Sequence, residues 1–182
     1  MTEPAENIAT IHQPAYYGFD TQQHRNFFFG LEHIQKIQPE ISRMFTAHWE
    51  ETETLYIDRQ LKPDWEMFYW MEANRRLLLF TVRDHNQRLV GNAMYFLGHS
   101  THIAGTLQAR EDTFYLAKDA RGMGIAPKFL KYVEKCLKEL KVVYMGMSDK
   151  SPVGGKSLQP LMEGLGFKQI AVFYQKDLTK ED

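Results

Sequence analysis

One stretch of the chain decides the fold. Residues 114–126 read FYLAKDARGMGIA, in which a β-favouring segment ends, a turn with Gly122 and Gly124 follows, and a helix pattern begins. The helix predicted over residues 123–140 carries its apolar side chains on one face and most of its lysines elsewhere. Glycines let a backbone turn tightly and approach a ligand closely, and the first N–H groups of a helix bind anions. The stretch therefore predicts an anion site, suited to a pyrophosphate, where a strand passes into a helix.

The turn does not fit two other phosphate-binding motifs. A P-loop needs Gly-Lys-Ser/Thr at its end, and a dinucleotide-binding fingerprint needs another glycine spacing after a strand of a parallel sheet. Residues 121–126 match instead the pattern Arg/Gln-x-x-Gly-x-Gly/Ala. The alternative interpretation is an ordinary structural turn between a strand and a helix.

The elements around this turn predict a mixed sheet. Two helices are expected first, over 38–52 and 63–75, and then three antiparallel strands, over 77–82, 89–97 and 107–118. After the long helix we expect a buried strand over 142–147, a short helix over 157–163, and a last strand pair over 167–170 and 172–176. This order predicts an α/β (α+β) fold.

Composition and charge place the chain among globular proteins and limit its ligands. Of 182 residues, 43% are apolar and 25% are charged, and the formal net charge is −1. Residues 1–100 carry 9 Lys and Arg against 13 Asp and Glu, whereas residues 101–182 carry 13 against 10. Binding to nucleic-acid phosphates needs clustered basic side chains, so direct nucleic-acid binding is not expected. We expect an anionic ligand in the more basic second half.

The sequence predicts one domain preceded by a polar segment. Residues 1–24 are weakly patterned and predict an N-terminal arm, and residues 25–182 predict a single domain. The N-terminus lacks the pattern of a secretory signal, and no apolar run approaches the roughly 20 residues of a membrane span. We therefore expect a cytoplasmic protein with no membrane partner.

Metal chemistry is not expected. The single cysteine, Cys136, excludes an internal disulfide and a multi-cysteine metal site, and it lies on the apolar face of the long helix. His99 and His102 lie in a predicted loop with no third ligand nearby in sequence, so a contact with the substrate is the more favoured role for one of them.

Together with this order of elements, the motif of residues 121–126 resembles the GNAT superfamily of acyl-CoA-dependent N-acetyltransferases. The resemblance covers about residues 38–178, and it includes LMEGLGF at 161–167, which is similar to the family's Leu-Tyr-x-x-Leu-Gly-Phe signature. A narrower resemblance is to the acetyltransferase-like proteins of tailed phages and prophages, which act in the host cytoplasm. It is carried by the sequences of residues 99–102, 109–116 and 174–178.

The resemblance implies a GNAT-like, mostly antiparallel central sheet flanked by helices, with acetyl-CoA as co-substrate and no metal. It implies that the strand ending at Leu116 pairs with the pantetheine arm and that Lys128 contacts the adenosine phosphates. It also implies that the pyrophosphate binds the backbone amides of Arg121, Gly122, Met123, Gly124, Ile125 and Ala126.

Two acidic residues are candidates for the base that takes the proton of the attacking amine. Family members often carry an acidic residue in this strand, which makes Asp112 the first candidate and Glu111 the second. Period-two alternation places Asp112 on the face of Leu116 and Glu111 on the other face. The family signature also has a tyrosine that protonates the leaving thiolate.

Met162 stands where the family has that tyrosine. Either Tyr174 or Tyr144 replaces it, or solvent does, or the protein is weakly active or inactive.

The resemblance implies transfer of an acetyl group to a primary amine of a protein lysine, a polyamine or another small molecule. A cationic acceptor is favoured by the acidic residues of the first half, namely Glu50, Glu51, Glu53, Asp58, Asp64, Glu66 and Glu72. The alternative is a non-catalytic module that binds CoA or a partner, including a phage protein acting on a host protein or on modified DNA. A homodimer is expected because it is the commonest oligomer.

Overall fold

A mixed sheet organises the residues that the computed structural model describes, which are 18–52, 60–150, 157–172, 174 and 176–179. Its strands are β1 (Gln22–His24), β2 (Phe27–Leu31), β3 (Leu77–Asp84), β4 (Leu89–His99), β5 (Leu107–Leu116) and β6 (Tyr144–Gly146). They lie in this order, and all neighbours are antiparallel except β5 and β6, which are parallel. The helices are α1 (Gln38–Thr52), α2 (Trp65–Ala73), α3 (Ile125–Glu139) and α4 (Gln159–Gly164). The predicted mixed, mostly antiparallel fold is confirmed.

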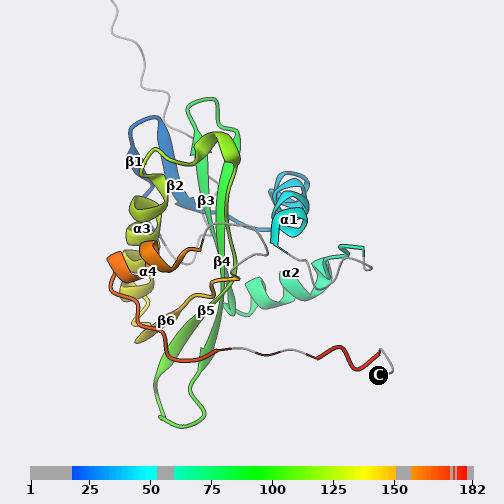
Figure 1. The fold of residues 1–182 in the computed structure, drawn as a ribbon, viewed down its shortest axis with the longest axis vertical. Helices are drawn as coiled ribbons and strands as arrows, with labels where there is room; N and C mark the ends of the chain where they lie inside the picture. The colour runs from blue at the N-terminus through cyan, green and yellow to red at the C-terminus, as the bar shows by residue number, and fades with distance from the viewer. Residues whose placement is uncertain (1–17, 53–59, 151–156, 173, 175, 180–182) are drawn as a thin grey trace, which may run out of the picture.

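Helices cover both faces of this sheet (Figure 1). On one face, α3 contributes Phe129 to a core that contains Phe80 of β3. On the other, α1 contributes Phe45 to a core that contains Leu79 of the same strand. Because β3 lies between two cores, all eight of its residues are buried and it reads as an almost continuous apolar run. No helix of the described residues is long and apolar enough to cross a membrane.

Two strands before α1 were not predicted from the sequence. β2 contains three consecutive phenylalanines, an aromatic run that favours a strand, and Phe29 is fully buried. β1 begins at Gln22, inside the segment predicted as an N-terminal arm, and Phe19 is also buried. Residues 1–17 lie outside the described part of the chain, and the arm and domain boundary stay predictions.

The strand pair predicted over 167–170 and 172–176 is wrong for the described residues, none of which is in a strand. Phe173 and Gln175 lie outside them. Ile170 is 95% exposed and Val172 is 62% exposed. A β-branched side chain favours a strand because it packs against neighbours, and these two have too little contact to gain that energy.

A buried ion network connects β2, β3 and α1. The Arg83 guanidinium donates from Nε and Nη2 to the two carboxylate oxygens of Glu32, at 2.9 and 3.0 Å. It also donates to Glu40 of α1 at 2.9 Å, and Thr81 donates to Glu32 at 2.6 Å. The Glu32 side chain is fully buried, so its charge depends on these bonds. The network therefore holds α1 against the sheet.

Replacing Arg83 should destabilise the fold strongly. Arg83→Met keeps the volume but leaves the Glu32 charge buried and uncompensated, so we expect a loss of about 3–5 kcal/mol in the free energy of unfolding. The double variant Arg83→Met/Glu32→Met should recover most of that loss. Arg43→Met, at an exposed position of α1, is the matched control and should change stability by less than about 0.5 kcal/mol. Urea denaturation measures all three, and equal loss in the single and double variants would contradict this account.

Candidate active site

The turn between β5 and α3 presents unpaired backbone amides. Gly122 and Gly124 have φ of 79° and 71°, in the left-handed region that other residues rarely adopt. Gly124 is the N-cap of α3 and supplies no capping side chain. In the described part of the chain, no acceptor receives a hydrogen bond from the N–H groups of residues 122–126. These amides and the helix dipole favour an anion at this place, and its binding there stays a prediction.

The side chain of Arg121 is held on the α1 side of this turn. Its Nε donates to the Leu116 carbonyl at 2.8 Å, and its Nη2 donates to the Glu51 carboxylate of α1 at 2.9 Å. The guanidinium lies over the Tyr115 ring, and the Tyr115 hydroxyl donates to the same carboxylate at 2.8 Å. Burial and the bond to Glu51 raise the pKa of Tyr115 to about 12. Arg121 therefore connects α1 to the turn. Its own backbone N–H donates to the Lys118 carbonyl at 3.3 Å, so of the predicted amides only those of residues 122–126 lack an acceptor among the described residues.

Two further basic residues lie at this end of the sheet. Arg25, in the turn between β1 and β2, donates to the Met123 carbonyl at 3.2 Å. Lys128 is exposed in the first turns of α3, as the sequence predicted for a contact with phosphates. Ile125 is buried in the core and fixes the start of the helix.

The edge of β5 beyond its pairing with β6 is open. β6 pairs with β5 only at Gln108, Ala109 and Arg110. The remaining residues of β5, 111–116, span about 17 Å and have no strand beside them on this edge among the described residues. One end of the open edge reaches the turn of residues 121–126. At the other end, Glu111 accepts from Ser148, after β6, through its backbone N–H at 3.1 Å and its hydroxyl at 2.8 Å.

A β-bulge in β5 changes the direction of its acidic side chains. The pairing with β4 shifts between Met94 and Tyr95, which leaves Asp112 without an opposite residue. Tyr95 belongs to the α3-side core and pairs with Glu111, and directly opposite residues share a face. Glu111 therefore lies on the same face as Leu116. The prediction that these two residues lie on opposite faces is wrong because alternation breaks at a bulge.

The environment of Glu111 favours its neutral form. Burial raises the pKa of its carboxyl, and the charge of Asp112 adds to the effect, while the bonds from Ser148 oppose it. Across the strand pair, Tyr95 is fully buried, and its hydroxyl has no hydrogen-bond partner among the described residues. Burial and the Glu111 charge raise the pKa of Tyr95 as well. Glu111 lies at the end of the open edge next to β6. A carboxyl with a raised pKa at this place is suited to accept a proton near neutral pH.

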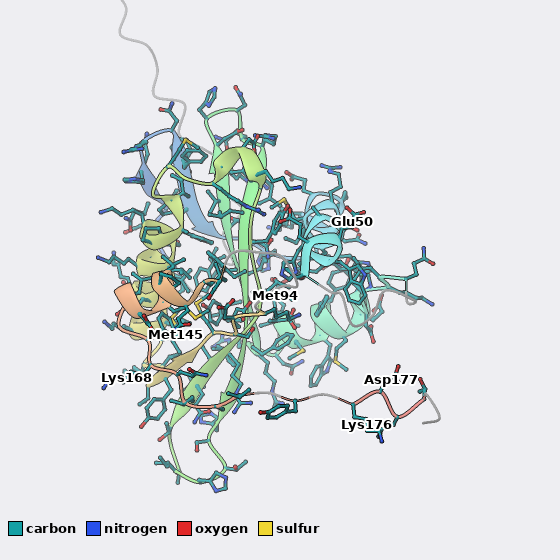
Figure 2. The ribbon with its side chains drawn as sticks, viewed as in Figure 1. Glu50, Met94, Met145, Lys168, Lys176 and Asp177 are labelled. Carbon is teal, nitrogen blue, oxygen red and sulfur yellow. The ribbon has the colours of Figure 1, made fainter. Side chains whose placement is uncertain are left out.

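The structure does not bring the predicted tyrosines to this edge. Tyr174 is 91% exposed in a segment without regular structure, and Figure 2 shows Lys176 and Asp177 of that segment far from Met145 of β6. Tyr144 is half-exposed and lies at the paired end of β5, opposite Gln108. Met162 lies partly buried on α4.

Sequence reasoning missed Glu51, Arg25 and Ser148 as parts of the site. Glu51 is 70 residues from its partner Arg121, and no local pattern connects them. Ser148 was weakly indicated by the sequence, because it is a polar residue that directly follows the strand predicted over 142–147.

Comparisons with known proteins agree with this geometry. Residues 41–167, well over half of the chain, match the model of the acetyltransferase (GNAT) family. No curated protein matches the chain significantly.

Several solved structures share the fold. The ribosomal-protein-alanine N-acetyltransferase of Brucella melitensis biovar Abortus 2308 has a TM-score of 0.62 at 16% identity, covering 82% of this chain and 99% of that one. A predicted acetyltransferase of Clostridium acetobutylicum, solved with acetyl-CoA, has a TM-score of 0.62 at 16% identity, covering 84% and 97%. AAC(6')-Iy, in complex with the bisubstrate analogue CoA-S-monomethyl-acetylneamine, has a TM-score of 0.61 at 14% identity, covering 85% and 99%. The family match over most of the chain shows that this protein belongs to the acetyltransferase (GNAT) family of enzymes.

Proposed function

We propose that this protein transfers the acetyl group of acetyl-CoA to a primary amine, of a protein lysine, a polyamine or another small molecule, by direct attack in a ternary complex. The observation that carries the proposal is the open edge of β5, which leads from the free amides of residues 122–126 to the Glu111 carboxyl. An extended pantetheine arm fits beside such an edge, because its amide groups can pair with backbone groups that have no other partner. The thioester of acetyl-CoA would then lie near the Glu111 end of the edge.

The coenzyme is assigned to this chain's own residues from the turn outward. The backbone amides of Gly122, Met123, Gly124, Ile125 and Ala126 hold the pyrophosphate, with the Arg121 amide engaged by the Lys118 carbonyl. The strand edge ending at Leu116 pairs with the pantetheine arm, and Lys128 contacts the adenosine phosphates. No metal takes part. We also retain the cytoplasmic location and the homodimer as predictions from the sequence.

Glu111 is the preferred base, with Asp112 as the second candidate. The neutral amine nitrogen attacks the thioester carbonyl, the tetrahedral intermediate collapses, and the C–S bond breaks to release the CoA thiolate. Glu111 takes the proton that the amine loses, directly or through a water molecule. Tyr174 lies exposed in a segment without regular structure, and Tyr144 lies at the paired end of β5, so neither is preferred as the acid and solvent protonates the thiolate.

Replacement of Gly124 tests the coenzyme site. Gly124→Glu puts a carboxylate among the amides and should abolish binding of acetyl-CoA and free CoA. Gly124→Ala is the matched control, because it imposes the same strained φ of 71°, at about 1–2 kcal/mol, without a charge, and should keep most of the affinity. Calorimetric titration of both ligands measures the effect, with circular dichroism as the check on folding. Undiminished binding by Gly124→Glu would show that the turn is only structural.

The pH dependence of turnover tests the base. Burial raises the pKa of Glu111, so its proton-accepting carboxylate form increases only as the pH rises through that raised value. We expect kcat/KM to climb with pH along a limb above the ordinary carboxyl range. Glu111→Gln should lose that limb and lower kcat by roughly 10²–10⁴-fold.

Asp112→Asn is the control for this experiment. It should keep the rising limb, because Asp112 only adds to the raised pKa of its neighbour. If Asp112→Asn loses the limb and Glu111→Gln keeps it, the base is Asp112.

Met162 favours a second candidate function, a non-catalytic module that binds CoA or a partner, which a phage could also encode. A protein of this kind has no use for an acid at the leaving thiolate. It would bind CoA normally, lose that binding in Gly124→Glu, and acetylate no amine in a broad acceptor screen. Turnover on any primary amine separates the two functions.

A further inference from the structure

A hollow of about 420 Å³ lies at the end of the β4–β5 hairpin, outside the machinery assigned above. Two cross-strand pairs form its floor, Phe96 with Arg110 and Gly98 with Gln108. Phe96 belongs to the core on the α1 and α2 side, so these pairs face that side of the sheet. We call this space the hairpin hollow; its lining is Phe96, Leu97, Gly98, His99, Ser100, Thr101, His102, Gln108 and Arg110.

One position of the floor, Gly98, has no side chain and is open to the hollow. A Cβ built on Gly98 would meet nothing within 4 Å. On one side, the Phe96 ring stacks with Phe68 of α2 at 6.5 Å between centroids. The Leu97 N–H also donates to the carbonyl of Arg76, which follows α2, at 2.8 Å. The position of this wall is therefore fixed by α2 and the residues after it.

The lining is rich in hydrogen-bond donors. Arg110 is exposed, and its guanidinium has no hydrogen bond or ion pair with any described residue. Gln108, His99 and His102 add side-chain N–H donors, and Ser100 and Thr101 add hydroxyls. No described residue of the lining carries a carboxylate. A guanidinium is always charged and binds carboxylate and phosphate through paired hydrogen bonds.

The acidic residues that favoured a cationic acceptor are largely engaged elsewhere. Glu51 is bound to Arg121, Asp64 caps α2 through the Met67 N–H at 3.0 Å, and buried Glu72 accepts from the Ile34 N–H at 2.9 Å. Glu53 and Asp58 lie outside the described residues. Glu50, on α1 (Figure 2), and Glu66 remain exposed. Neither lies in the lining of the hollow.

We propose that the hairpin hollow binds an anionic group, a carboxylate or a phosphate, that belongs to the acetyl acceptor. This inference rests on the proposed function, because it places the amine of the same molecule at the thioester beside the open edge of β5. Gln108 is three residues from Glu111 along β5, about 10 Å, and because their side chains lie on opposite faces of the sheet, the acceptor reaches the open edge from the α1 and α2 side. The acceptor is therefore a small amine whose anionic group lies several bonds from its nitrogen, and Arg110 is a specificity-determining residue.

Matched acceptors test this directly. The probes are 6-aminohexanoate, its uncharged amide 6-aminohexanamide, and 5-aminopentyl phosphate, each titrated calorimetrically into the protein saturated with CoA. We expect at least one of the two acids to bind at least tenfold more tightly than the amide, which corresponds to about 1.4 kcal/mol. The stronger of the two acids tells whether the group is a carboxylate or a phosphate. Turnover with acetyl-CoA should follow the same order.

Variants assign the preference to the hollow. Arg110→Gln should reduce the affinity for the acids to that for the amide and leave the affinity for the amide unchanged, and Arg110→Lys should restore part of the preference. Gly98→Val fills the hollow without backbone strain and should weaken both acids. Arg43→Gln, an exposed arginine on α1, is the control and should change nothing.

Equal binding of acid and amide, no binding of either acid, or tighter binding of spermidine than of both acids would overturn the inference. A preference for the acids that survives Arg110→Gln would also overturn it. If the wild type does not bind CoA, the proposed function fails instead. The same titrations into the protein without CoA then still decide whether the hollow takes an anion.

Discussion

The backbone of β5 is paired along almost its whole length on one side but only at its start on the other. β4 pairs with it from Leu107 to Leu116 except at the bulged Asp112, whereas on the other side β6 pairs only with Gln108, Ala109 and Arg110, and Val143 donates to the Leu107 carbonyl. Backbone N–H and C=O groups that leave water need hydrogen-bond partners, so an open edge inside a folded domain is a place for another extended chain. The site depends on this edge, because both the amide-bearing turn and the Glu111 carboxyl lie at its ends.

The two ends of the edge are held by different means. At the turn, left-handed glycines and the start of α3 orient the amides, and Arg121, bound to Glu51, connects the turn to α1. At the other end, Glu111 accepts two hydrogen bonds from Ser148, which link β5 to the residue after β6. One end therefore offers free amides that favour negative charge, and the other holds a carboxyl whose pKa is raised by burial.

The two helical layers of this enzyme have separate consequences for function. α3 begins at the turn proposed to bind the coenzyme, and it contributes to the larger of the two cores. α1 is held by the Arg83 network at its start and reaches the turn through Glu51 near its end. α2 forms one wall of the hairpin hollow through the contact of Phe68 with Phe96. α1 thus connects the Arg83 network to the turn before α3.

The sequence alone was enough to predict the elements that depend on interactions between neighbouring residues. Apolar spacing marked the helices and the central strands, and the paired glycines before an amphipathic helix marked the anion site, because periodicity and backbone freedom are properties of neighbouring residues. Other features are visible only in the folded structure: the bulge at Asp112, the face on which Glu111 lies, the bond between Glu51 and Arg121, and the hollow beside Gly98. The structure also shows that the residues after α4 form no strands in the described part, although their sequence favours them. These features arise from contacts between segments far apart in the chain, and their energy depends on the partner that each residue meets rather than on its own type.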